Sequence, residues 1–104
     1  MERDNLLISF PDYYNNDEYV QFEIESKGYF VDVYVKADSK LYRISFYDAV
    51  RLSQDITLHL EEGNPYFFEE NLLILTKVTK EKMTQAILAL VENGGLNVLK
   101  ADED

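Results

Sequence analysis

The residues of this chain best suited to chemistry are a lone histidine and two pairs of carboxylates. His59 follows Asp55 by four residues, so on a helix the carboxylate would lie one turn away and could orient the imidazole as a general base. No nucleophile can be placed beside His59 from the sequence, and the chain has no cysteine. A single helical histidine is more often a surface residue, so we expect no catalytic residue here.

The acidic pairs Glu61-Glu62 and Glu69-Glu70 flank a turn at 63–65 and could converge on a cation. Their spacing does not match a calcium-binding loop, so we expect no metal site. Glu61 and Glu62 also stand at the predicted end of a helix, where negative charge is unfavourable. That placement favours contact with Lys or Arg groups of another molecule. The alternative is that these carboxylates only keep the surface solvated.

Other common chemistries are not indicated by the sequence. The four glycines, at positions 28, 63, 94 and 95, fall at predicted turns and helix ends rather than in a phosphate-binding loop. A chain of 104 residues rarely encloses a sugar-binding cleft, and no two acids stand in an apolar setting. We therefore expect no cofactor, and a small hydrolase is only the third-ranked function.

Charge is the most unusual property of the composition. Twenty acidic residues against ten basic ones give a net charge of -10. Such a field repels nucleic acids and anionic membranes and attracts basic proteins, so we expect no direct nucleic-acid binding and no membrane binding. The absence of cysteine rules out disulfides, and no signal peptide or membrane span is recognisable, so a cytoplasmic location is expected.

The length and the hydrophobic content of 46% predict one small domain spanning residues 1–104, with 1–4 and 100–104 frayed. A short strand is predicted at 6–10, followed by a loop through residue 18 whose adjacent Tyr13 and Tyr14 either pack back on the domain or form an exposed patch. Alternation of apolar and polar residues then predicts strands at 19–25, 30–36 and 41–46. Two-residue turns at Lys27-Gly28 and Asp38-Ser39 would join them into an antiparallel meander.

This register predicts one apolar face and one open polar face. On the open face Glu23 comes opposite Asp32, while Arg43 lies across from Tyr34 and diagonally from Asp32. Arg43 could bridge the carboxylates or stack on the tyrosine ring. A bulge near Gly28 would instead turn Phe30 and Asp32 toward the apolar face, so the register argues against it. The predicted apolar pairs are Ile24 with Val31, Phe22 with Val33, Val20 with Val35, Val35 with Tyr42, Val33 with Ile44 and Val31 with Phe46.

Two helices follow, on the evidence of a period of 3.6. The first is predicted at 46–62, capped by Ser45, with the stripe Ala49, Leu52, Ile56 and Leu60 packed on the meander. The second begins after Thr79, has a hydrophobic staple of Val78 with Met83, and ends at 93–95. Leu88 falls off its main stripe, which indicates either burial on two sides or a partner.

Short strands are predicted in the remaining segments, at residues 66–75 and 96–99. Residues 66–75 read as two strands, or as one strand with a break, and Leu72 to Leu75 suggest burial on both faces. Residues 96–99 read as a last strand. The predicted fold is therefore α+β, with an antiparallel meander sheet, two helices on one face and short C-terminal strands.

The composition resembles that of proteins that occupy basic grooves, such as immunity proteins, nuclease inhibitors and DNA mimics, because eight tyrosines accompany the carboxylates. The leading hypothesis is a non-enzymatic module that binds a basic protein, in the manner of an inhibitor or immunity-type protein. Its predicted binding residues are Glu23, Asp32, Tyr34, Arg43, Glu61, Glu62, Glu69 and Glu70. The alternatives are a self-associating homodimer and an acidic surface that serves solubility alone.

Overall fold

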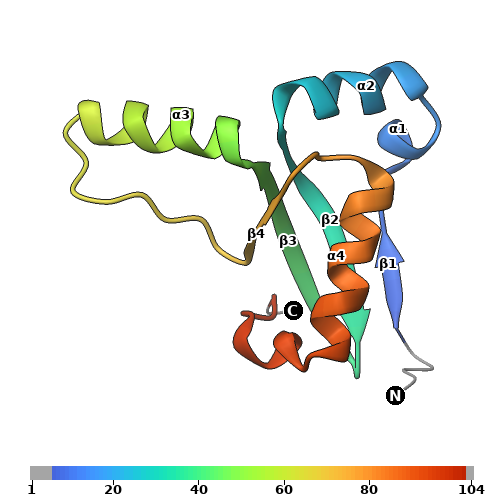
Figure 1. Cartoon of the computed structure of the whole chain (residues 1–104). Coiled ribbons are helices and arrows are strands. Elements are labelled where there is room, and N and C mark those ends of the chain that lie inside the picture. Colours follow the sequence, from blue (N-terminus) through green and yellow to red (C-terminus); the bar gives the residue numbers. More distant parts are fainter. Residues whose placement is uncertain (1–5, 103–104) are drawn as a thin grey trace.

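The structure is a computed structural model that describes residues 6–102, and it has an α+β fold built on a four-stranded sheet. Figure 1 shows one long helix lying against the sheet, two helices at one end of it, and a further helix that extends away from it. The elements in chain order are β1 (Leu7–Ser9), α1 (Asp12–Asn15), α2 (Glu18–Lys27), β2 (Tyr29–Ala37), β3 (Lys40–Asp48), α3 (Ala49–Glu61), β4 (Leu72–Leu75), α4 (Lys80–Glu92) and the 3-10 helix η1 (Gly95–Val98).

The sheet is mixed rather than a purely antiparallel meander. Its order is β1-β2-β3-β4, and β3 and β4 run parallel while the other neighbours are antiparallel. The turn at Asp38-Ser39 is confirmed, since both residues have positive φ, as a two-residue hairpin requires. The predicted register beyond it is also confirmed, because Val35 pairs with Tyr42 and Val33 with Ile44.

The strand predicted at 19–25 is wrong, because these residues belong to helix α2. The Asp17 side chain accepts hydrogen bonds from the first-turn amides, and Gly28 ends the helix in the left-handed conformation. Only Ile24 of this helix is buried, so its apolar residues do not form the stripe by which helices are recognised. Consequently Lys27-Gly28 is not a hairpin turn, and Glu23 does not lie across a strand pair from Asp32.

A β-bulge that the sequence did not predict is present in β2, at a different place from the bulge at Gly28 that the register argued against. Phe30 pairs with Phe46 and Val33 with Ile44, so Val31 and Asp32 together oppose Ser45. The extra residue lets Phe30 and Val33 both face the core, and both are buried. The predicted pairing of Val31 with Phe46 is therefore wrong by one residue, whereas Asp32 stays on the open face.

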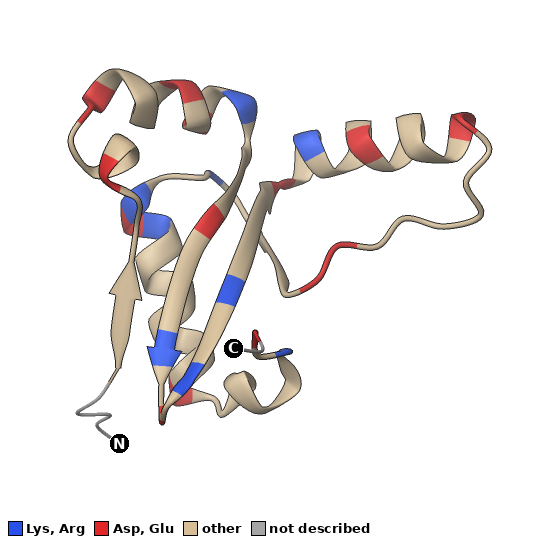
Figure 2. Cartoon of the chain, turned by 180° about the vertical axis from the view of Figure 1, so that it is seen from behind, with Lys and Arg blue, Asp and Glu red and all other residues tan. Residues whose placement is uncertain are grey.

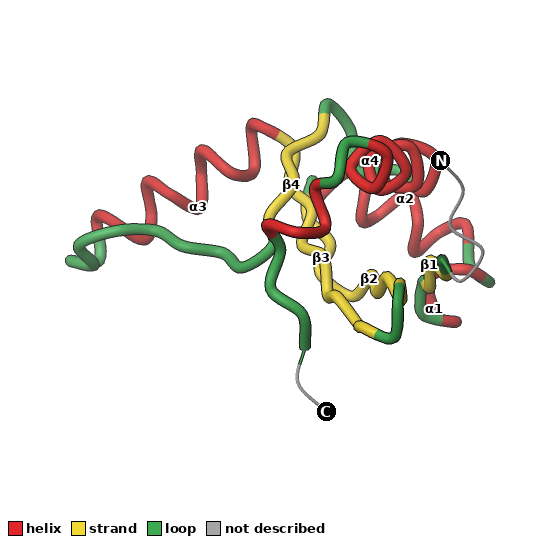
Figure 3. The backbone as a smooth tube through the Cα atoms, turned by 90° about the horizontal axis from the view of Figure 1, so that it is seen from below, coloured by secondary structure: helices red, strands yellow, loops and turns green. Residues whose placement is uncertain are grey.

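Helix α4 covers the apolar face of the sheet. The cap at Thr79 is confirmed, and Val78 and Met83, the predicted staple, are both fully buried. Ile87 and Val91 extend the same stripe, while Leu88 is exposed. Figure 3, which looks along the sheet from below, shows α4 and α2 on one side of the strands. The buried core consists of Tyr14, Ile24, Phe30, Val33, Val35, Ala37, Tyr42, Ile44, Phe46, Val78, Met83, Ile87, Val91 and Leu96.

Helix α3 does not pack on the sheet as predicted. It begins at Ala49 rather than at 46, because Asp48 caps it, and Ser45 is a buried residue of β3. None of its thirteen residues is buried. Figures 1 and 3 both show α3 and the chain that returns from it extending away from the rest of the molecule. The apolar face of the sheet is already covered by α4, so the stripe of α3 has no place there.

The C-terminal third also departs from the prediction. Only one strand forms between 66 and 75, and its residues are half-buried, except for the exposed Ile74. Residues 96–99 do not form a strand, since Gly95–Val98 is a 3-10 helix. The tail is held by a hydrogen bond of 2.7 Å from the Asp102 amide to the Leu41 carbonyl. Residues 1–4 and 103–104 lie outside the described residues.

Of the two tyrosines of the predicted loop, Tyr14 packs into the core while Tyr13 stays exposed. Tyr14 is stacked between Phe10 and Phe30, and its hydroxyl has no hydrogen-bond partner among the described residues. Burial, together with the charge of Glu25, raises the pKa of Tyr14 to about 12. The hydroxyl therefore carries a desolvation cost that no bond offsets.

We predict that Tyr14→Phe keeps or raises the free energy of unfolding, by up to about 1 kcal/mol, because the buried hydroxyl is unsatisfied. Above pH 10 the unfolded tyrosine releases its proton while the native one keeps it, so stability falls as pH rises toward 12. This alkaline loss should be smaller in Tyr14→Phe. Urea unfolding at neutral and alkaline pH measures both effects, and a loss of more than about 1 kcal/mol at neutral pH would show that the hydroxyl is satisfied.

Candidate functional site

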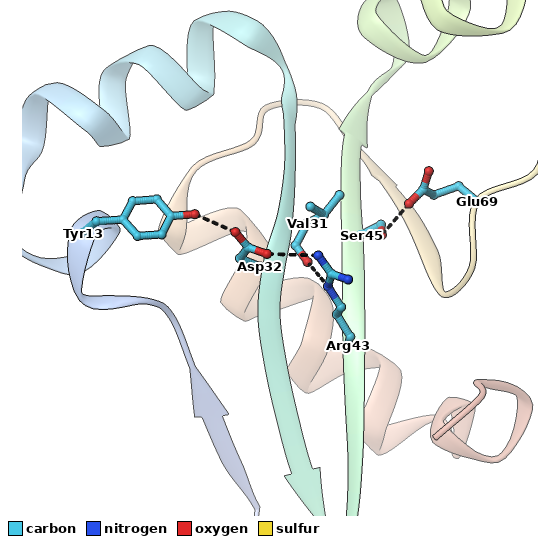
Figure 4. A network of polar contacts seen from close by, with 6 residues as sticks. All are labelled: Tyr13, Val31, Asp32, Arg43, Ser45 and Glu69. Carbon is cyan, nitrogen blue, oxygen red and sulfur yellow. Dashed lines mark hydrogen bonds and ion pairs between the residues drawn. The ribbon is translucent and has the colours of Figure 1, made fainter. Parts of the chain in front are cut away.

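A small polar network lies on the open face of β2 and β3 (Figure 4). The Tyr13 hydroxyl donates to one oxygen of Asp32 at 2.7 Å, and the Arg43 guanidinium donates to the other at 3.1 Å. The Arg43 Nε also donates to the Val31 carbonyl at 3.0 Å. Tyr34 pairs with Arg43 across the strands. Of the interactions considered for Arg43, the ion pair with Asp32 is present, while Glu23 takes no part in it and Asp32 is in the bulge.

The Tyr13 hydroxyl keeps its proton and therefore remains a hydrogen-bond donor in this network. Loss of hydration, the hydrogen bond to Asp32 and the charge of that carboxylate raise the pKa of Tyr13 to about 12. Since Arg43 neutralises Asp32, this part of the open face has less free negative charge than the sequence predicted.

The second candidate surface is the projecting segment, which we call the arm and define as α3 with the loop of residues 62–71. Its exposed apolar side chains include Val50 and Leu58 on the helix and Phe68 on the loop, which are 68%, 57% and 72% exposed. Leu60 and Tyr66 are exposed as well. Surface apolar residues are normal when scattered, but here five of them lie on one short segment.

The root of the arm is fixed by a compact set of contacts. The Asp48 side chain caps α3 by accepting from the Arg51 amide at 2.8 Å, and the Asp48 amide donates to the Gly28 carbonyl at 2.9 Å. The Arg51 side chain bonds Asp55 at 3.0 Å and the Lys27 carbonyl at 3.3 Å. Arg51 thus ties the first turn of α3 to the end of α2, which sets the direction in which the arm leaves the domain.

Aromatic rings line the inner side of the arm. Phe67 contacts the His59 ring edge to face at 5.6 Å between centroids, and it contacts Tyr47 in the same way at 6.3 Å. Tyr47 in turn packs on Tyr29 at 4.6 Å, and the Arg51 guanidinium lies over the Tyr29 ring. Burial, followed by the charges of Tyr29 and Glu69, raises the pKa of Tyr47 above its ordinary value. Phe67 therefore connects the loop of the arm both to α3 and to β3.

The acidic pairs predicted to converge do not meet at one point. Glu61 and Glu62 stand at the end of α3, where Figure 1 shows the far end of the arm. Glu69 instead accepts a hydrogen bond of 3.0 Å from the Ser45 hydroxyl, as Figure 4 shows, and Glu70 pairs with Lys100 at 3.5 Å. No group of acids and histidine suited to a metal ion occurs within residues 6–102.

His59 is placed by packing rather than by a carboxylate. Asp55, which the sequence offered as its orienting partner, pairs with Arg51 instead. The nearest ring to His59 in the arm is Phe67, and a shallow hollow beside them is lined by Asp55, Leu58, His59, Glu62 and Phe67. The imidazole therefore lacks the partner that a general base of the predicted kind requires.

The arm is strongly acidic. Residues 49–71 contain five carboxylates and one arginine, with His59 as the single histidine. In Figure 2 the acidic positions likewise outnumber the basic ones along α3 and its returning loop. The arm therefore combines exposed apolar side chains with a negative field.

The exposed residues of the arm that the sequence did not single out are aromatic and aliphatic rather than charged. Tyr66, Phe67 and Phe68 were assigned to a strand because aromatic runs favour strands. The signal that could have identified them as a loop is Asn64-Pro65 directly before and a second polar turn at Asn71, which has a φ of 52°. Val50 and Leu58 lie off the helical stripe, so their exposure could have been expected.

Comparisons with known proteins identify no relative. The chain matches no protein-family model, and neither curated proteins nor solved structures show a significant similarity to it. None of the helices within residues 6–102 has the length and apolar character needed to cross a membrane.

We predict that Gly28→Ala disturbs the root of the arm. Gly28 has a φ of +73°, and an added Cβ would overlap the Asp48 carboxylate that caps α3. Gly94→Ala is the matched control, because Gly94 has a φ of +74° and nothing lies within 4 Å of its Cβ position. Both variants should lose about 1–2 kcal/mol for the left-handed conformation, and Gly28→Ala about 1 kcal/mol more for the cap.

Urea unfolding measures the difference between these two variants. Equal losses would mean that the Asp48 cap moves without cost and does not fix the arm.

Proposed function

We propose that this protein is a non-enzymatic protein-binding module, and that the arm is its principal contact element. The observation that carries the proposal is that α3 is amphipathic and yet has no buried residue. A helix of thirteen residues is close to the length at which isolated helices are only marginally stable in water. Most helices of this kind are stabilised by full burial of their apolar face, whereas in α3 the stripe residues Leu52 and Ile56 are only half-buried.

The chemistry of the arm favours a partner with an apolar groove bordered by Lys or Arg. The apolar groups Leu58, Leu60 and Phe68 supply contact area, and the carboxylates around them supply steering. The side chains of Glu61 and Glu62 make no hydrogen bond or ion pair within residues 6–102, so their carboxylates are free to meet basic groups. An inhibitor or immunity-type protein that neutralises a basic partner is the form of this function that the acidic composition favours.

The open-face residues contribute less to this proposal than the sequence suggested. Asp32 and Arg43 neutralise each other, and Glu69 and Glu70 already have partners. Tyr34 is half-buried beside Arg43. We therefore place the main contact at Leu58, Leu60, Glu61, Glu62 and Phe68, and retain Tyr34, Asp32 and Arg43 as a neighbouring surface.

Self-association through the arm is the second candidate, because an unpacked amphipathic helix would also suit a second copy. The net charge of -10 opposes it, since two acidic arms would have to approach each other. Light scattering at low and high salt separates the two candidates. We expect a monomer at both salt concentrations. A stable dimer that an arm variant fails to form would instead show that the arm binds a second copy of this chain.

We predict that the double variant Leu58→Ser and Phe68→Ser retains the fold but loses its partner. Both side chains are exposed in the free protein, so the free energy of unfolding should change by less than about 0.5 kcal/mol. Their burial in a complex would stabilise it, so affinity should fall at least about tenfold. Val98→Ser is the matched control, because Val98 is 83% exposed on η1 and should leave binding unchanged.

The proposal is tested by affinity capture from extracts of the producing cells. The captured partner is then purified and its binding is measured. The captured protein should bind less tightly as salt rises, and the arm variant should not recover it. A partner that binds the arm variant and the wild type equally would contradict the proposal.

A further inference from the structure

A hollow of about 310 Å³ lies between α2 and the first residues of β2, next to the root of the arm. One wall is a single face of α2, because Val20, Glu23, Ile24 and Lys27 follow the spacing of one helical stripe. The other wall is formed by the β2 residues from Tyr29 to Asp32, and Tyr13 of α1 closes one side. The volume is at the lower end for ligand sites, so it suits one side chain rather than a large cofactor.

The surfaces of this hollow are aromatic and apolar at the base. Phe30 and Ile24 are buried beneath it, and Tyr13 packs edge to face on Phe30 at 6.4 Å between centroids. Tyr29 contributes a third ring at the opposite end. The bulge in β2 is the local cause, because it turns Phe30 into the base of the hollow while Val31 and Asp32 remain at its edge.

Two carboxylates stand at the edge of these rings. Asp32 is held in place by Tyr13 at 2.7 Å and by Arg43 at 3.1 Å. Glu23 is exposed, and its carboxylate makes no hydrogen bond or ion pair within residues 6–102. Lys27 is the one cation among the nine lining residues. The sequence predicted Glu23 and Asp32 as neighbours across two strands, and the hollow brings them together in a different way.

We propose that this hollow binds a lysine or arginine side chain of a protein partner. The aliphatic stem would lie on the aromatic base, and the cationic end would meet the Glu23 carboxylate, while Asp32, already paired with Arg43, fixes the edge of the hollow. A neutral apolar side chain would leave the Glu23 carboxylate without a partner, and an anion would meet that carboxylate in a chain of net charge -10. The proposal does not depend on the arm, and the two sites could serve one partner.

The test uses n-butylguanidinium as a probe of the arginine side chain and n-butylurea as its neutral counterpart. Both are titrated into the full chain, and amide chemical shifts are followed by NMR. The expected result is saturable shifts for the guanidinium at residues of the hollow, such as Val20, Ile24 and Val31, with much weaker binding of the urea. Equal binding of the two probes, or shifts that do not saturate, would overturn the proposal.

A pair of charge variants locates the binding. Glu23→Gln should lower the affinity for n-butylguanidinium by about two- to fivefold, as expected for the loss of one partly exposed ion pair. Glu92→Gln is the matched control, because Glu92 is exposed on the last turn of α4 and makes the same change in net charge. An equal effect of both variants would mean that the probe responds only to overall charge. Because neither variant alters the arm, failure here leaves the proposed function of the arm untouched.

Discussion

The sheet has only one apolar face, and α4 occupies it. Met83, Ile87 and Val91 pack there against Val33, Val35 and Ile44. All of these residues except Val91 are completely buried. Helix α2 lies on the same side and adds Ile24 to the core, so no room is left there for α3. Helix α3 leaves the domain for this reason, and its direction is set at the root by the Asp48 cap and by Arg51. The exposed apolar arm is a consequence of how the core is filled.

Much of the fold could be predicted because several short sequence patterns are typical of one structural element. Asp38-Ser39 is a hairpin turn, Thr79 is a helix cap, and the alternation through Val33 and Val35 is a strand. Helix α2 was missed because Val20, Phe22 and Ile24 alternate like a strand. Its caps, Asp17 and Gly28, were the better evidence, since Phe22 is exposed and only Ile24 is buried.

The candidate sites could be predicted only in part, because charge is readable from a sequence and spatial placement is not. The bridge between Asp32 and Arg43 followed from strand pairing that was correct on one side of Asp32. The bulge beside it shifts one residue, and a shift of that size exchanges the two faces of a strand. The arm could not be foreseen, because a stripe such as Leu52 and Ile56 records that a helix is amphipathic but not what covers it.

The most direct test of the arm as an unpartnered element is native-state hydrogen exchange of the free protein, compared between α3 and α4. Amide protection follows local packing, and α3 has no buried residue while α4 is anchored in the core. The amides of α3 should exchange through local opening at far lower free energy than those of α4. Equal protection of the two helices would contradict the account, because it would mean that α3 is packed as firmly as the core and needs no partner.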